Sequence, residues 1–188
     1  MNRIHLWFCR SERWKRRLKA EVLPWALEGV SLEAADVLEL GPGPGLTTDF
    51  LSNRVRSLTA LELDSELARS LGRRIGGSGV RVVNGDATML PFAGGRFSTV
   101  LAFTMLHHVP SPVLQDQLFS EAFRVLKPGG IFLGIDSRAS LRMRVFHLWD
   151  TMVIIDPDIL PRRLESSGFS DVAVSATDRR FRFTARRH

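Results

Sequence analysis

A short glycine-rich turn carries the residues best placed for chemistry. An apolar run ends in Glu39, and glycines follow at every second position, as Gly41, Gly43 and Gly45. Glycine permits positive φ angles and lets a ligand lie against bare backbone amides. A dinucleotide-binding turn of the form G-x-G-x-x-G would need another glycine where Leu46 stands. The turn therefore predicts a ligand site, and the spacing argues against a pyrophosphate.

Carboxylates after the next two apolar runs suit the recognition of a nucleoside. Glu62 ends the second run, where an ionised carboxylate can accept from both hydroxyls of a ribose. Asp64 is near, and we favour Glu62, which ends the run, for the ribose and Asp64 as the cap of the next helix. Asp86 follows the third run and could accept from an adenine amino group, while the backbone amide of Ala87 serves a ring nitrogen.

Alternating strands and helices must position these residues. We expect strands over Asp36–Leu40, Leu58–Leu63, Val80–Asn84, Phe97–Phe103 and Ile131–Asp136, and a terminal antiparallel pair over Val172–Ala176 and Arg180–Ala185. We expect helices over Ser11–Gly29, with a kink or a new helix at Pro24, and over Leu46–Arg54, Ser65–Ile75, Ser111–Val125 and Pro157–Gly168, the last capped by Asp156. This order predicts an α/β fold with a doubly wound, mostly parallel sheet between helix layers. Ligands of such folds bind beyond the carboxyl ends of the strands, where the candidate residues all fall.

Five motifs in this order resemble those of the class I S-adenosylmethionine (SAM) dependent methyltransferases. They are the glycine turn, Ala60–Asp64, Asn84–Phe92, Phe97–Val100 with Leu106–Val109, and Phe123–Gly130. The resemblance covers about residues 35 to 136. Ser98 replaces the aspartate usual in the family. Phe103-Thr104-Met105-Leu106 stands where the N/D-P-P-Y/F motif would be, so methylation of an exocyclic base nitrogen is not expected.

The resemblance implies SAM as the cofactor and a seven-stranded sheet whose last strand is antiparallel. It assigns Glu39 and Gly41 to the methionine end of the cofactor, and Phe103 and Thr104 to the wall beside it. The complete set of expected cofactor-binding residues is Glu39, Gly41, Pro42, Gly43, Gly45, Thr47, Glu62, Leu63, Asp86, Ala87, Phe103 and Thr104. No metal site is expected.

Two adjacent histidines, His107 and His108, are the candidates for catalysis. A sulfonium-borne methyl needs only an aligned nucleophile and the exclusion of water, and a general base is needed when the acceptor arrives protonated. Histidine titrates near neutrality, which suits that role, with His107 the first choice. Alternatively, both rings pack at the start of a helix and shape the floor of the pocket.

Aromatic and apolar residues near the two ends could roof the site. They are Trp7, Phe8 and Trp14, and in the segment Ser137–Ile155 the residues Leu141, Val145, Phe146, His147, Leu148, Trp149, Asp150 and Met152. Such walls favour a small lipophilic or aromatic methyl acceptor, although the same side chains could simply complete the core. The alternatives are an RNA or protein methyltransferase that uses basic termini, and a non-catalytic SAM-binding module.

Length and composition fit a single methyltransferase domain over residues 1–188. We expect an N-terminal helical cap (1–30), a SAM-binding core (35–136) and a substrate-side segment with the last helix and hairpin (137–188). The single cysteine, Cys9, excludes an intrachain disulfide and a multi-cysteine metal site. No apolar run approaches the roughly 20 residues of a membrane span, and the N-terminal run is too short for a signal peptide, so we expect a cytoplasmic protein.

Charge is unevenly distributed along the chain. The net charge is +6, with residues 1–30 at +4, residues 31–136 at −2 and residues 137–188 at +4. The basic ends could contact nucleic acid or anionic lipid. They could equally form a solvated helix face and an arginine-rich edge strand.

Overall fold

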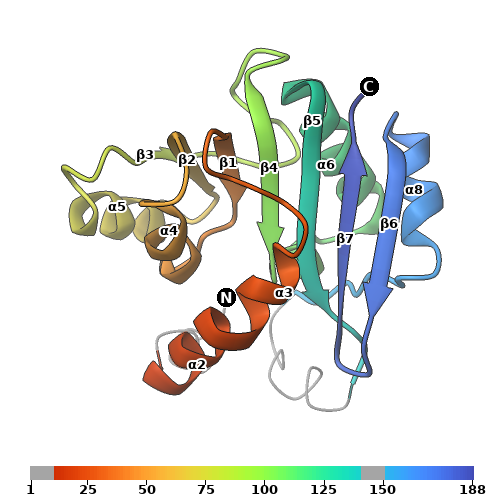
Figure 1. Cartoon of the computed structure of the whole chain (residues 1–188), viewed down its shortest axis with the longest axis horizontal. Coiled ribbons are helices and arrows are strands. Elements are labelled where there is room, and N and C mark those ends of the chain that lie inside the picture. Colours follow the sequence, from red (N-terminus) through yellow and green to blue (C-terminus); the bar gives the residue numbers. More distant parts are fainter. Residues whose placement is uncertain (1–10, 141–150) are drawn as a thin grey trace.

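A single seven-stranded sheet organises the computed structural model, which describes residues 11–140 and 151–188 (Figure 1). Its strands are β1 Asp36–Leu40, β2 Ser57–Glu62, β3 Arg81–Asn84, β4 Phe97–Phe103, β5 Leu126–Ser137, β6 Ser170–Ala176 and β7 Arg180–Arg186. They lie in the order β3-β2-β1-β4-β5-β7-β6. β7 is antiparallel to both its neighbours, and the pairs among β1 to β5 are parallel. The predicted fold class and the antiparallel last strand are confirmed.

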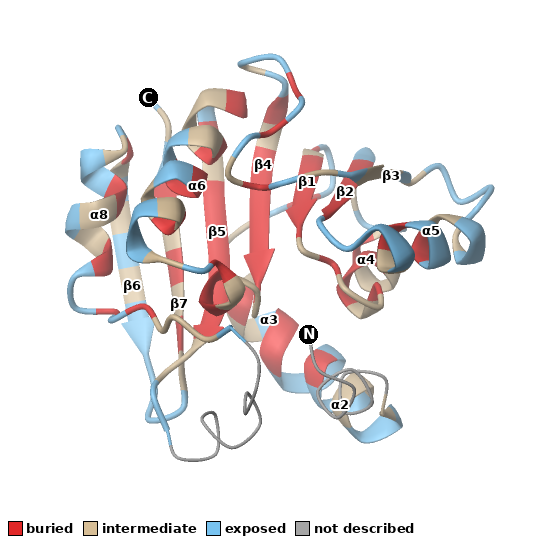
Figure 2. Cartoon of the chain, turned by 180° about the vertical axis from the view of Figure 1, so that it is seen from behind, coloured by how far each residue is buried: buried red, intermediate tan, exposed pale blue. Residues whose placement is uncertain are grey.

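Helices cover both faces of the sheet. They are α2 Glu12–Arg17, the π-helix η1 Leu18–Val22, α3 Leu23–Ala26, α4 Leu46–Leu51, α5 Ser65–Arg74, the 3-10 turn η2 Leu106–His108, α6 Pro112–Val125 and α8 Leu160–Ser166. The helices from α2 to α4 share one apolar cluster with β1, β4 and β5, whereas α6 and α8 belong to a second cluster on the opposite face (Figure 2). The central strands β1 and β4 are buried almost throughout, as the continuous apolar runs predict.

The N-terminal helix begins where the sequence predicts but continues through Pro24. Ser11 Oγ accepts from the backbone N–H of Trp14 at 3.2 Å, which confirms it as the cap. Pro24 has no N–H to donate and its ring would crowd the preceding turn of a regular α-helix. The wider π turn of η1 lies at that turn, and the chain then continues as α3.

Several predicted boundaries differ from the structure, and two elements begin three or more residues from the predicted start. The last helix begins at Leu160 rather than at Pro157, with Pro161 in its first turn, while the Asp156 carboxylate accepts from the N–H of Asp158 at 3.0 Å and closes a separate turn. β5 begins at Leu126 rather than at Ile131, because Gly129 N–H donates to the carbonyl of Arg187 at 2.6 Å and extends the pairing. Neither difference moves the carboxyl ends of the strands.

Within the described ranges, no helix is long and apolar enough to cross a membrane.

Candidate cofactor and acceptor site

The glycine turn joins β1 to α4 in a conformation that requires its glycines. The φ angles are +61° at Gly41, +55° at Gly43 and +85° at Gly45. A Cβ at Gly45 would collide with Leu71 of α5, whereas a Cβ at Gly43 would meet no atom within 4 Å. Gly43 borders two cavities, so its open side is the space available to a ligand. This is the bare backbone that the sequence predicts.

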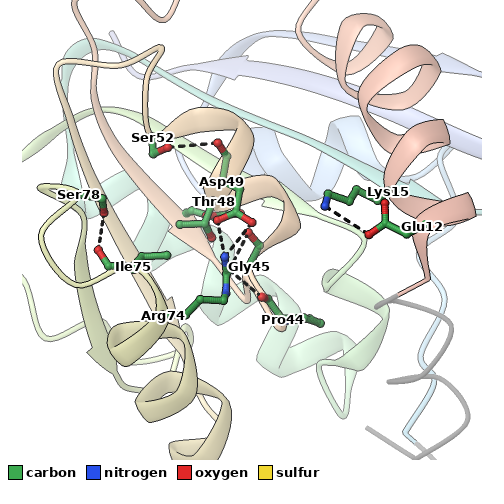
Figure 3. Close-up of polar contacts among 11 residues, drawn as sticks. Glu12, Lys15, Pro44, Gly45, Thr48, Asp49, Ser52, Arg74, Ile75 and Ser78 are labelled. Carbon is green, nitrogen blue, oxygen red and sulfur yellow. Dashed lines mark hydrogen bonds and ion pairs between the residues drawn. The ribbon is translucent and has the colours of Figure 1, made fainter.

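Arg74 of α5 supports the turn from outside. Its guanidinium donates to the Asp49 carboxylate at 2.7 Å and to the carbonyl of Pro44 at 3.0 Å (Figure 3). The contact joins α5, α4 and the turn into one rigid unit. Sequence reasoning missed Arg74, because it lies 29 residues beyond Gly45 and only the packing of α5 brings it there.

Glu62 lies at the end of β2 and is tied to the same turn. Its side chain is only 7% exposed, and its two oxygens accept from the N–H of Gly43 at 2.9 Å and of Asp64 at 3.0 Å. A carboxylate offers about four lone-pair sites, so it keeps capacity for further donors. Asp64 caps α5 by accepting from Glu66 and Leu67 N–H, as predicted. β2 ends at Glu62, so Asp64 lies beyond the strand and serves as the helix cap.

Asp86 stands on the loop after β3. Its Oδ1 accepts from both the N–H and the hydroxyl of Thr88 at 2.8 Å, which orients the carboxylate. Within residues 11–140 and 151–188, no hydrogen bond is made by Oδ2. Asp86, Ala87 and Glu62 border one cavity with Leu63, whose apolar side chain is 69% exposed.

Two cavities meet at the carboxyl edge of the sheet. The larger, of about 560 Å³, contains Glu62, Leu63, Asp86 and Ala87 in its wall. The smaller, of about 70 Å³, is bordered by the predicted residues Pro42, Thr47, Phe103 and Thr104, and by Trp14 and Leu18 of the N-terminal helix. Gly41, Gly43 and His108 border both. All expected cofactor residues except Glu39 and Gly45 thus line one continuous region.

Glu39 lies behind the turn rather than on the cavity wall. Its side chain is 1% exposed and accepts from the hydroxyls of Thr47 and Thr48, the latter at 2.7 Å. Burial raises the pKa of Glu39 to about 7, and the two hydrogen bonds oppose this only in part. The geometry makes Glu39 a brace between β1 and α4, and its assignment to the methionine end stays a prediction.

The two histidines occupy different environments within η2. His107 is 3% exposed, with its Nδ1 2.5 Å from Asp136 Oδ1, and its backbone N–H donates to Asp136 Oδ2 at 3.1 Å. Burial raises the pKa of Asp136. The charge of His107 and the hydrogen bonds that the Asp136 carboxylate accepts outweigh this effect, so the pKa of Asp136 is lowered overall. His108 borders both cavities, whereas His107 borders neither. The geometry therefore favours His108 for contact with substrate, although the sequence placed His107 first.

Asp136 is a second residue that sequence reasoning missed. It is the penultimate residue of β5, at the same edge as Glu62, and this position was the available signal. The acceptor-side segment joins the same network, because Val153 N–H donates to the carbonyl of His107 at 2.8 Å. Gln115, fully buried on α6, donates to the carbonyls of Leu106 and Val153. η2 is thus fixed from three elements.

The predicted roof is described only in part. Trp14 borders the smaller cavity and Thr151 the larger, whereas Ile155 is buried in the core. Met152 is half-buried and borders neither cavity. The other residues of the predicted roof lie outside the described residues: Trp7, Phe8, Leu141, Val145, Phe146, His147, Leu148, Trp149 and Asp150. In the part of the chain that the structure describes, no cluster of histidine, cysteine and acidic side chains could hold a metal ion.

Comparison with known proteins decides the family. A family model described as "Methyltransferase domain" matches residues 38–134, from β1 to β5. The chain belongs to the class I SAM-dependent methyltransferases. SAM is accordingly the cofactor of this methyltransferase, and the glycine turn, Glu62 and Asp86 all fall within the matched region.

Relatives of this methyltransferase act on different acceptors. It is 37% identical over 109 residues to the fatty-acid O-methyltransferase of Mycolicibacterium smegmatis, covering 57% of this chain and 39% of that protein. It is 25% identical over 88 residues to the ribosomal RNA small subunit methyltransferase A of Mesomycoplasma hyopneumoniae, covering 47% of this chain and 34% of that protein. The chain therefore spans well under half the length of either relative.

A SAM dependent methyltransferase from Aquifex aeolicus has the same fold. The two structures superpose with a TM-score of 0.77 over 98% of both chains, at 17% sequence identity. This similarity supports the fold of the methyltransferase and says nothing of its acceptor.

Proposed function

We propose that this methyltransferase transfers the methyl group of SAM, by in-line displacement, to a small lipophilic or aromatic acceptor. The observation that carries the proposal is the mixed wall of the larger cavity. It contains the carboxylates of Glu62 and Asp86 and also an apolar set, Met105, Val109, Pro110 and Leu114. A volume of about 560 Å³ lies within the usual range of small-molecule sites. The fatty-acid O-methyltransferase relative supports an acceptor of this class.

The residues present fit SAM. Glu62 suits the ribose hydroxyls, because its carboxylate is held in place by two backbone amides and still has acceptor capacity. Asp86 suits the adenine amino group, and the exposed side chain of Leu63 offers an apolar contact for the ring. Gly43 has no Cβ, and the space that a Cβ would enter is open, so the cofactor can approach the backbone there. The smaller cavity, beside Thr47 and Thr104, is assigned to the methionine part.

The bound cofactor supplies an electrophilic methyl on a sulfonium. The chain has to orient the acceptor and exclude water from the reacting atoms. His108 borders both cavities, so it is the residue placed to accept a proton from a hydroxyl acceptor. His107 and Asp136 act on His108 by fixing the turn that carries it.

Cofactor binding and acceptor choice are tested separately. Calorimetry with SAM and with its demethylated product should show binding to the full chain, and Asp86→Asn should weaken it more than Glu165→Gln, an exposed control on α8. An acceptor screen with labelled SAM should then contain fatty acids, phenols, RNA and protein. Transfer to the lipophilic compounds supports the proposal. Transfer to RNA or protein alone refutes it, and SAM binding without any transfer favours a non-catalytic module.

A further inference from the structure

The two basic ends of the sequence meet in the fold. α2 and the turn between β6 and β7 lie at the end of the sheet toward which β4 and β5 point (Figure 1). Arg17 of α2 and Arg179 and Arg180 of the turn border a shared cavity of about 300 Å³ together with Trp25. We call Arg17, Arg179 and Arg180 the arginine cluster. Arg17 lies on the same N-terminal helix as Trp14 and Leu18, which border the smaller cofactor cavity.

The cluster carries positive charge that the protein does not neutralise. Arg17 is paired with Glu21 at 3.0 Å, and Asp178 also borders the cavity. The side chains of Arg179 and Arg180 make no hydrogen bond or ion pair with the described residues. Burial lowers the pKa of Arg180, and the charges of Arg17 and Arg179 add to this against the opposing effect of Glu21. Like charges held together in this way favour a bound anion.

Exposed aliphatic side chains gather at the same edge. The large hydrophobic residues that stand out as exposed in the described ranges are Leu63, Met89, Val113 and Ile159, at 69%, 74%, 74% and 50%. Each lies on a connection that leaves the carboxyl end of a strand: after β2, after β3, at the start of α6 and at the start of α8. The four side chains therefore lie at the carboxyl edge of the sheet, and Leu63 also borders the larger cavity.

Arginine beside exposed aliphatic groups matches the chemistry of a lipid surface. Basic side chains are attracted to anionic headgroups, and aliphatic side chains enter the boundary between headgroups and acyl chains. A single-stranded nucleic acid would instead favour exposed aromatic side chains on which its bases stack. The exposed groups here are aliphatic, so lipid is the better match.

We propose that the carboxyl edge of this methyltransferase docks on an anionic membrane surface, with the arginine cluster on the headgroups and the exposed side chains of Met89, Val113 and Ile159 in the interface. The cofactor cavities then open toward the lipid, and an acceptor could enter from the bilayer. That consequence rests on the proposed function, whereas the docking itself does not.

Vesicle binding tests the docking directly. The full chain is sedimented with vesicles of phosphatidylcholine, with and without phosphatidylglycerol, at low and at raised salt. We expect binding only to the anionic vesicles and its loss as salt rises. The variant Arg179→Gln/Arg180→Gln should bind about 25-fold more weakly, at roughly fivefold for each arginine lost from the surface. Met89→Ser/Val113→Ser should bind roughly threefold more weakly.

A matched control removes the same charge from the opposite edge. Arg73 in the last turn of α5 and Arg81 at the start of β3 are exposed and face away from the carboxyl edge, so Arg73→Gln/Arg81→Gln should bind as the unaltered chain does. Equal losses in the control and cluster variants, an unchanged affinity of the aliphatic variant, or arginine-dependent binding to RNA in place of vesicles would each overturn the proposal. All variants should bind SAM normally, so failed docking stays distinguishable from a failed methyltransferase assignment.

Discussion

Replacing Glu39 with glutamine should make the protein more stable at alkaline pH. The Glu39 carboxyl is 1% exposed, and it is braced by the hydroxyls of Thr47 and Thr48. Glutamine has the same shape and can keep a hydrogen bond to each hydroxyl, because a hydroxyl can donate or accept. The substitution therefore removes the buried charge and little else.

The magnitude follows from the pKa of Glu39, which burial raises from 4.5 to about 7. A raised carboxyl pKa means that the folded state holds the proton more tightly than the unfolded state, so stability falls as pH rises from the lower pKa to the higher. At about 1.36 kcal/mol for each tenfold change, the full loss is about 3 kcal/mol above pH 7. The glutamine variant does not lose this stability, because its side chain does not ionise.

Urea denaturation of both proteins at about pH 5 and about pH 8 measures the effect. The stability gained by Glu39→Gln should grow by about 2–3 kcal/mol between these conditions. A difference that does not change with pH would refute the reasoning, because the other titrating groups are common to both proteins. SAM calorimetry on the same variant tests the assignment from family resemblance. If Glu39 only braces β1 against α4, the affinity for SAM should be nearly unchanged. If Glu39 contacts the methionine part directly, the affinity should fall.

Three further predictions concern the site. Gly43→Ala should weaken SAM binding by roughly tenfold in calorimetry, because its methyl would enter the cavity and its φ of +55° is strained for alanine; an unchanged affinity would show that no ligand approaches the turn. His108→Ala should lower kcat and flatten the pH–rate profile near neutrality while leaving SAM affinity intact, and a normal profile would exclude a proton-accepting role. Asp136→Asn should destabilise the protein by about 3 kcal/mol in thermal denaturation at neutral pH, since it breaks a buried pair. That loss should shrink in acid, because a carboxyl with a lowered folded pKa loses its stabilising effect as pH falls, and equal losses at both pH values would contradict the pairing.

The placement of the expected cofactor residues at one edge of the sheet was predictable because it depends on local sequence. β1, β2 and β3 each end at or shortly before predicted residues, and parallel strands place those ends at one edge of the sheet. Asp64 follows Glu62 by two residues, a spacing that strand alternation does not separate; β2 ends at Glu62, and Asp64 beyond it caps α5. The choice between His107 and His108 was not predictable in this way. Both lie in a 3-10 turn, where successive side chains diverge, and only the packing of Asp136 shows which ring is buried.

Elements from both ends of the chain also reach the two cavities. Trp14, near the N-terminus, borders the smaller cavity, while Thr151, which follows β5, borders the larger. The arginine cluster likewise forms only because β7 inserts between β5 and β6, so that its turn lies beside α2. No local sequence pattern predicts that these arginines lie together, since their proximity follows from the topology of the whole sheet. The methyl-donor motifs lie within residues 38–134, whereas Trp14 and Thr151 reach the cavities from segments outside that range.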